Sequence, residues 1–300
     1  MGNVTKDQHF PRNPNYNDPG ILGGTWTNTV TGEVWECVGH YNINALKVMD
    51  AGYIWHLKDD NSSGSGGGAK EPYIEETYDA NGYLTSVVMH GYTKVPSTKF
   101  SNNGKLQTFV DYGTTIKSIE RGAFGGCTSL ALTSLPSGLT IISDDAFTYC
   151  ISLALTSLPD GITNIGQGAF NGCTSLALTS LPDGITSIGQ GAFGGCTSLA
   201  LTSLPSGLTS ILNNAFMYCD GLVSMSIHSG INTINSAAFG KCGGLTSVTF
   251  EGKPSGNMAK NIFQGCINLT EIKVPWAEGA VANAPWGATN ATITYNYTGE

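Results

Sequence analysis

Seven of the eight cysteines in this chain recur at a nearly constant interval, and no other feature constrains the fold as strongly. Six of them are 23 residues apart, and the seventh follows after 24. A phenylalanine precedes each of them by three positions, in an Ala-Phe or Ile-Phe pair. A leucine-rich period of about 20 to 29 residues indicates a solenoid, in which each repeat forms one coil and stacks on the next. The series is Cys127, Cys150, Cys173, Cys196, Cys219, Cys242 and Cys266.

Charge limits the classes of partner. The net charge is −8, and between residues 119 and 250 the only Lys or Arg residues are Arg121 and Lys241. Nucleic-acid binding requires clustered Lys and Arg, so we expect no nucleic-acid partner. The first twenty residues contain no apolar segment typical of a signal peptide, and no run of 18 apolar residues predicts a membrane span. We therefore expect neither an export signal nor membrane insertion.

The periodic cysteines do not have the spacing of a metal site or a disulfide framework. Residues at one phase of a solenoid have parallel Cα–Cβ vectors in adjacent coils, which disfavours the dihedral angle of an S–S bond. None of the seven has a second cysteine or a histidine within four residues, as a zinc site requires. We predict buried, reduced cysteines; oxidation or metal binding is the alternative. No residue pattern calls for a cofactor.

One repeat, residues 173–195, predicts the course of a coil. Its LALTSL stretch is short, aliphatic and followed by Pro182-Asp-Gly, which predicts a strand ended by a turn. Ile185 and Ile188 predict a second short extended segment. The glycine-rich segment from Gly189 to the next cysteine predicts one helical turn. Stacked coils would then form a parallel β-sheet on one face of the solenoid and short helical turns on the other.

Composition and repeat quality predict five regions. Residues 1–60 form a small β attachment module, and 61–69 a Ser/Gly linker. Residues 70–118 form an N-terminal cap, with a strand or hairpin over 71–92, and a degenerate repeat. The 23-residue repeats occupy 119–275, and 276–300 form a C-terminal cap.

The repeats carry a family resemblance. The pattern LPxGITxIGxxAFxGCTSL, over roughly residues 85–275, resembles the BspA-like (TpLRR) subfamily of leucine-rich repeats. Members of this family are commonly adhesins or surface proteins of gut and oral bacteria and of some mucosal protists. The resemblance implies binding to matrix proteins, cells or glycans, with no fixed catalytic or binding motif. The LALTSLP repeats depart from the usual strand pattern, with Leu178 and Thr179 five and six residues after the cysteine.

The N-terminal module has a different resemblance. Two alternating runs flank the Val30-Thr-Gly-Glu33 turn and predict a hairpin, to which residues 53–57 add a third strand. Together they resemble small β-modules in bacteriophage tail-fibre and other virion proteins. This resemblance implies that the module docks to a particle.

Three groups of side chains are candidate ligand contacts. Trp26, Trp35 and Trp55 form either the core of the N-terminal module or a sugar-stacking platform. Tyr149 and Tyr218 replace the glycine that precedes the cysteine in other repeats, where an exposed aromatic residue would anchor a partner. A column of threonines would form a hydroxyl ladder that supports the sheet or binds a repetitive glycan. These are Thr133, Thr156, Thr179 and Thr202.

These observations predict a non-enzymatic binding or adhesion protein. The histidines are scattered and no carboxylates cluster within the repeats, which argues against catalysis. Our first hypothesis is a virion protein, assembled in the host cytoplasm, whose solenoid binds a host surface protein or glycan. Its N-terminal module would bind other virion proteins, and a homo-oligomer is possible. The alternatives are a bacterial cell-surface adhesin and a purely structural virion decoration protein.

Overall fold

The computed structural model describes residues 25–27, 34–40, 53–58, 72–113 and 115–299. The chain divides into two compact units, Met1–Ala69 and Lys70–Glu300. Each unit is described below by itself.

The first unit contains a three-stranded antiparallel sheet. Its strands are β1 (Thr25–Thr27), β2 (Val34–His40) and β3 (Tyr53–Lys58), in the order β1-β2-β3. The predicted hairpin and third strand are therefore confirmed. Trp26 is paired with Trp35, and Trp55 with Cys37. Only the backbone of these strands is described, so the roles predicted for the tryptophan side chains lie outside the described residues.

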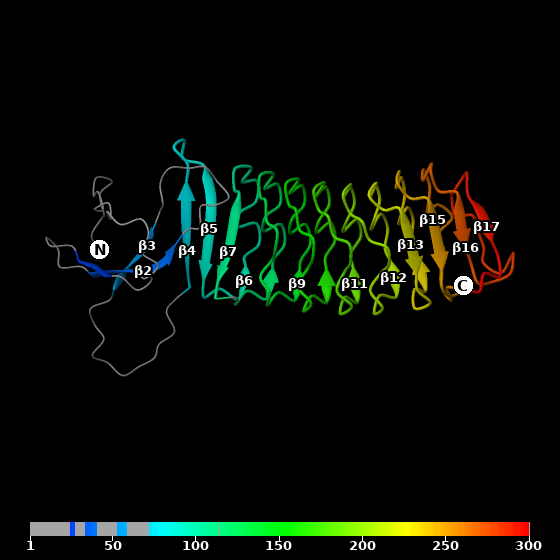
Figure 1. The fold of residues 1–300 in the computed structure, drawn as a ribbon, viewed down its shortest axis with the longest axis horizontal. Coiled ribbons are helices and arrows are strands. Elements are labelled where there is room, and N and C mark those ends of the chain that lie inside the picture. Colours follow the sequence, from blue (N-terminus) through cyan, green and yellow to red (C-terminus); the bar gives the residue numbers. More distant parts are fainter. Residues whose placement is uncertain (1–24, 28–33, 41–52, 59–71, 114, 300) are drawn as a thin grey trace. The chain divides into compact units, whose positions relative to one another are not determined.

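The second unit begins with a hairpin, as predicted for residues 71–92. Strand β4 (Tyr73–Tyr78) pairs antiparallel with β5 (Leu84–His90), and β7 (Thr108–Tyr112) pairs parallel with β5. All pairing after β5 is parallel, so the hairpin forms the start of the solenoid (Figure 1).

Short parallel strands then recur once per coil. The five-stranded sheet has the order β11-β10-β9-β8-β6, and β12 and β14 pair in the same way further along the chain. The second residue of each strand is buried, because these residues are aligned in register and face the core. This confirms the extended segment predicted around Ile188. The strands are β6 (Lys94–Val95), β8 (Ser118–Ile119), β9 (Ile141–Ile142), β10 (Asn164–Ile165), β11 (Ser187–Ile188), β12 (Ser210–Ile211) and β14 (Thr233–Ile234).

The strand predicted over LALTSL is wrong for the LALTSLP repeats. Thr179 and Ser180 are both exposed between the buried Leu178 and Leu181, so the two-residue alternation of a strand is interrupted. The amide of Ala177 donates to the preceding coil at 3.0 Å, but no regular strand follows it.

Among the described repeats, only the later ones form a second sheet, at the positions that the LALTSL stretch occupies in the other repeats. Strands β13 (Ser224–Ile227), β15 (Ser247–Phe250), β16 (Glu271–Lys273) and β17 (Thr292–Thr294) pair in parallel, in that order. In β15, the buried Val248 and Phe250 alternate with less buried residues, as a strand requires.

The helical turns predicted on the opposite side are also wrong, because the described residues contain no helix there. We call the eight-residue segment that ends at each periodic cysteine the arc. In one arc, the amides of Asp145, Phe147 and Tyr149 donate to the next coil at 2.7 to 2.8 Å. The intervening amides donate to carbonyls three residues earlier. Alternate N–H groups therefore donate to the neighbouring coil. The arc thus lacks the continuous hydrogen bonds to residue i−4 that form an α-helix.

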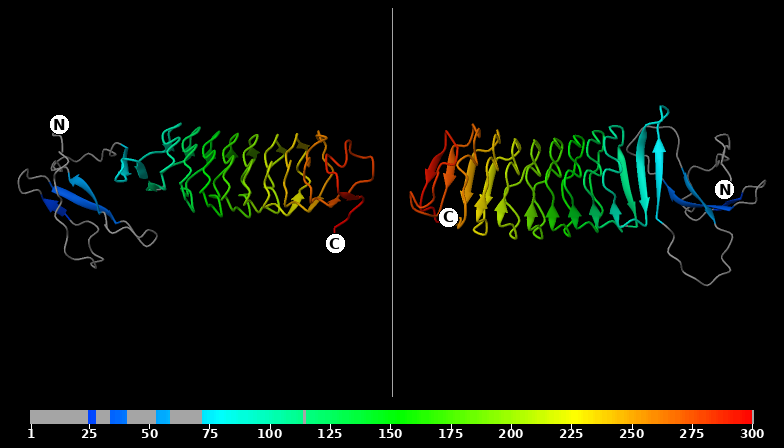
Figure 2. Two further views of the ribbon diagram at one scale, coloured as in Figure 1. Left: turned by 90° about the horizontal axis from the view of Figure 1, so that it is seen from above. Right: turned by 180° about the vertical axis from the view of Figure 1, so that it is seen from behind.

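The core is a set of columns that run along the coil stack. From Phe124 to Phe239, successive rings lie 5.3 to 5.5 Å apart and are stacked. All seven periodic cysteines are free and buried, as predicted. Each S–H donates to the phenylalanine carbonyl of the preceding coil, as Cys173 does to Phe147 at 3.1 Å. Figure 2 shows the coils from two further sides.

Aromatic residues cover the last coils. Trp286 is fully buried and contacts Phe250, with ring centroids 5.5 Å apart. The amide of Phe263 donates to the carbonyl of Trp286 at 2.9 Å.

Among the described residues, no helix is long and apolar enough to cross a membrane. The same residues contain no group of three or more His, Cys, Asp or Glu side chains that could hold a metal ion.

Candidate binding trough on the arc face

The backbone of the arc has two positions with positive φ, five residues and one residue before the cysteine. In the coils of Cys173 and Cys196 both positions are glycine, which adopts this conformation without a steric cost. Their φ angles are 60° for Gly168, 75° for Gly172, 62° for Gly191 and 75° for Gly195.

The two flanking coils carry side chains at the same positions. Asp145 and Tyr149 have φ angles of 55° and 57°, and Asn214 and Tyr218 have 57° and 61°. For a bulky residue this conformation costs about 1–2 kcal/mol, and glycine would avoid that cost. Ala237 and Lys241 have φ angles of 50° and 56° at the same positions of the Cys242 coil, so this conformation belongs to the arc itself. The exposed aromatic rings make the two tyrosine-bearing coils candidates for a binding role.

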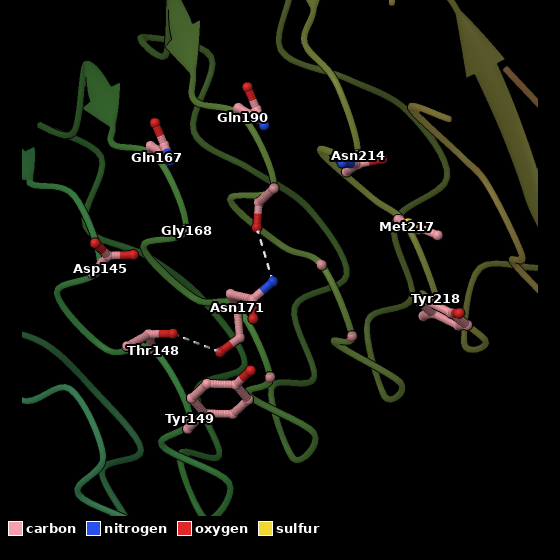
Figure 3. Close-up of a pocket in the computed structure, with 14 residues that line it drawn as sticks. Asp145, Thr148, Tyr149, Gln167, Gly168, Asn171, Gln190, Asn214, Met217 and Tyr218 are labelled. Atoms are coloured by element: carbon pink, nitrogen blue, oxygen red, sulfur yellow. Dashed lines mark hydrogen bonds between the residues drawn. The ribbon is translucent and has the colours of Figure 1, made fainter. Parts of the chain in front are cut away.

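The contrast between the coils creates a hollow on the surface. Two glycine-bearing coils lie between the Tyr149 coil and the Tyr218 coil and form a floor lower than either side. The resulting cavity, here called the arc-face trough, has a volume of about 580 Å³ (Figure 3). It extends over three coil steps, roughly 15 Å at the spacing of parallel strands.

The two tyrosines differ in how firmly they are held. Tyr149 is 61% exposed, and its ring leans over Gly172, where a Cβ atom would lie only 2.6 Å from the ring. Tyr218 leans toward the next coil, where the Nζ of Lys241 donates to its hydroxyl at 2.6 Å and lies 4.9 Å from the ring centroid. Tyr149 therefore has its ring free for a ligand, whereas Lys241 fixes Tyr218.

Amide side chains provide most of the polar lining. Gln167 and Gln190 occupy equivalent positions in adjacent coils and are exposed. The Nδ2 of Asn171 donates to the Gly191 carbonyl at 3.5 Å, and Asn214 completes the set (Figure 3).

The charge of the trough is a single carboxylate. Asp145 is the only charged residue among those that line it. Its Oδ2 lies 3.9 Å from Nη2 of Arg121, which belongs to the preceding coil and does not line the trough. The residues that line the trough include neither a paired acid and base nor a cysteine.

The structure brings only some of the predicted contacts together. Tyr149 and Tyr218 line one trough, at its opposite ends. The threonine column (Thr133, Thr156, Thr179 and Thr202) is exposed and does not line the trough. No hydroxyl ladder joins these four residues in the described structure.

Threonine hydroxyls do form ladders elsewhere in the coil. The Oγ1 of Thr140 donates to the carbonyl of Lys117 at 3.0 Å, and the same contact repeats at Thr163 and Thr186, with distances of 3.5 and 3.4 Å. The ladder prediction was therefore assigned to the wrong column.

Sequence reasoning missed the glycine floor and the amides. The signal that would have revealed them is a comparison of two positions in every repeat, five residues and one residue before the cysteine. In the described coils, the trough lies where two adjacent coils are glycine at both positions and the coils on either side are glycine at neither.

The stacked coils with a leucine-rich 23-residue repeat define a leucine-rich repeat solenoid. A family model described as "BspA type Leucine rich repeat region" matches residues 93–219 and 174–278, in six copies. The chain therefore belongs to the BspA-type leucine-rich repeat family. No curated protein sequence matches the chain.

Solved structures that match the chain include three bacterial proteins. The Treponema pallidum leucine-rich repeat protein TpLRR is 25% identical, with a TM-score of 0.45, over 57% of this chain and 87% of that one. A leucine-rich cell surface protein from Faecalibacterium prausnitzii is 22% identical, with a TM-score of 0.39, over 72% and 80%. The pneumococcal vaccine antigen PcpA is 17% identical, with a TM-score of 0.44, over 64% and 57%.

Proposed function

We propose that the protein is a non-enzymatic adhesin that attaches to a surface ligand through the arc-face trough. The observation that carries this proposal is the pair of exposed tyrosines, Tyr149 and Tyr218, held at positive φ on either side of a glycine floor. Membership of the BspA-type family and the amide lining are consistent with binding.

The geometry explains how such a site would bind. Tyr149 offers an exposed ring face, and aromatic anchors supply much of the energy of a protein interface. Gly191 and Gly195 let a ligand approach the backbone of the Cys196 coil, whereas the Tyr149 ring covers Gly172. Because Lys241 holds Tyr218, that wall loses little conformational entropy on binding.

Binding of the labelled full-length chain to a panel of bacterial and epithelial cells tests this proposal. The double variant Tyr149→Gly/Tyr218→Gly should bind at least about tenfold more weakly, because the loss of an aromatic anchor costs about 2 kcal/mol or more. Tyr83→Gly is the matched control, since Tyr83 is 54% exposed but lies in the β4–β5 turn, outside the trough. Unchanged binding by the double variant, or no binding by the wild-type chain to any cell, would overturn the proposal.

The location of the protein is a separate part of the proposal. We propose a particle or cell-surface location, with the first unit as the attachment module. The virion location rests on the resemblance of residues 1–60 to virion β-modules, and the bacterial cell surface is the second candidate because of the repeat family.

Immunogold labelling of purified particles and of intact bacteria distinguishes the two locations. Gold on particles would support the virion, and gold on bacterial cells would support the surface adhesin. If the solenoid were buried among particle subunits and inaccessible to antibody, the purely structural decoration role would replace adhesion.

A further inference from the structure

We propose that the ligand of the arc-face trough is an uncharged polysaccharide, which lies along the solenoid axis with a sugar ring stacked on Tyr149. This inference rests on the proposed binding function and specifies the chemical class of its ligand. It is carried by the chemistry, charge and repetition of the residues that line the trough.

The first argument is the match of functional groups. A pyranose ring combines an apolar C–H face with hydroxyl groups that both donate and accept hydrogen bonds. The exposed ring of Tyr149 can stack on the apolar C–H face, because aromatic side chains stack on flat apolar surfaces. Amide side chains can bind the hydroxyl groups, because each amide carries hydrogen-bond donors and an acceptor. Gln167, Gln190 and Asn214 form no side-chain hydrogen bond within the described structure and are free to bind hydroxyls.

The second argument is charge. Asp145 is the one charged side chain in the lining, and no Lys, Arg or His accompanies it there. Arg121 and Lys241 do not line the trough, and each is paired with a lining residue, Arg121 with the Asp145 carboxylate and Lys241 with the Tyr218 hydroxyl. A sialylated or sulfated glycan would bring its negative charge next to the Asp145 carboxylate, in a lining that contains no Lys, Arg or His. The trough therefore favours a neutral glycan over an anionic one.

The third argument is repetition. Gln167 and Gln190 are 23 residues apart and present the same amide from successive coils. Gly172 and Gly195 repeat the floor at the same step. One coil step, about 4.8 Å, is close to the length of a sugar unit in an extended chain. A polymer with a regular repeat would thus meet equivalent groups on these two coils, which favours an orientation along the axis.

A glycan array with neutral, sialylated and sulfated oligosaccharides tests the inference with the full-length chain. We expect binding to neutral oligosaccharides, and a loss of about tenfold or more in Gln167→Ala/Gln190→Ala, which removes the two exposed amides. Gln264→Ala is the matched control, because Gln264 is an exposed glutamine of the Cys266 arc outside the trough. Binding to sulfated or sialylated glycans alone would overturn the inference.

Treatment of the target cells separates the inference from the proposed function. If cell binding is abolished by periodate, which oxidises sugar diols, but survives protease, both hold. If cell binding requires Tyr149 and Tyr218 but is abolished by protease and resists periodate, the ligand is a protein. In that case the inference fails while the adhesin function stands. Loss of all cell binding by the wild-type chain would overturn both.

Discussion

At the scale of single residues, the binding role proposed for the tyrosines of the trough carries a cost in stability. Tyr149 has a φ angle of 57° at a position where Gly172 and Gly195 are relaxed in neighbouring coils. Its ring is exposed, so it contributes little to the core. Under the proposed function, this exposed ring is retained for an interaction outside the chain.

Tyr149→Gly should therefore leave stability unchanged or raise the free energy of unfolding by up to about 1 kcal/mol, while it weakens binding. The relief of the left-handed strain is partly offset by the greater entropy of glycine in the unfolded chain. Tyr218→Gly should raise the free energy of unfolding by less, because this variant loses the hydrogen bond from Lys241. Urea unfolding of the two variants checks this order. A large destabilisation by Tyr149→Gly would show that the ring has a structural role.

The buried cysteines give the protein a specific dependence on pH. Burial raises the pKa of the Cys173 thiol from its ordinary value of 9.0 to about 12. Burial likewise raises the pKa of Cys127 to about 11. Above pH 9 the unfolded chain loses these protons while the folded chain retains them. Stability is therefore fully present below about pH 9 and falls as pH rises, up to about pH 11 for Cys127 and about pH 12 for Cys173, by about 1.4 kcal/mol per pH unit for each thiol.

Urea midpoints measured from pH 8 to pH 10 under reducing conditions test this dependence. Cys173→Ser should be less stable at pH 8, yet its stability should fall less steeply with pH, by the contribution of one proton. If the urea midpoint falls with pH equally in Cys173→Ser and in the wild-type chain, the Cys173 thiol has the same pKa in the folded and unfolded chains.

At the scale of elements, the columns of the core were predictable and the backbone between them was not. Phe170 and Ile188 repeat with the cysteine period, and each is buried at the predicted phase. The conformation of the arc depends on which amides pair with the next coil, and no single repeat contains that information. The strand over LALTSL was predicted from its aliphatic residues, but the exposed Thr179 and Ser180 interrupt the alternation.

The phenylalanine column predicts a sharp contrast in stability between two changes in one region. Phe170→Ala should cost about 3–5 kcal/mol, because Phe170 is fully buried and stacks on rings at 5.5 Å on both sides. Thr179→Ser should cost less than about 0.5 kcal/mol, because Thr179 is exposed. Chemical denaturation of both variants measures the difference. Equal costs would mean that the inward and outward phases of the coil are wrongly assigned.

At the scale of the whole solenoid, the trough is a property of four successive coils and belongs to none of them alone. The sequence identified Tyr149 and Tyr218 as departures from the repeat, but their meaning depends on the glycine-bearing coils between them. The N–H groups of these arcs bond from coil to coil, so the coils keep a common register. A solenoid thus builds a site by varying a few positions on an otherwise constant backbone.

The same architecture predicts that a destabilising substitution in one coil affects mainly the neighbouring coils. Trp286 is fully buried against Phe250, and its carbonyl accepts the amide of Phe263, so it closes the last coils. Trp286→Ala removes a core residue at a cost of about 3–5 kcal/mol. Because each coil contacts only its neighbours, the loss should loosen the C-terminal coils and weaken with distance from them.

Amide hydrogen exchange measured by mass spectrometry tests this locality. In Trp286→Ala, protection should fall over residues 240–299 and remain near the wild-type level over 119–175. Phe147→Ala, which changes a fully buried ring of the Cys150 coil, is the control that should lower protection in that N-terminal half. A uniform loss across all coils in Trp286→Ala would show that the solenoid unfolds as one cooperative unit. The trough, which is made of coils far from Trp286 in the stack, should then lose its ligand together with the cap. If protection is lost only locally, binding by Trp286→Ala should match the wild-type chain.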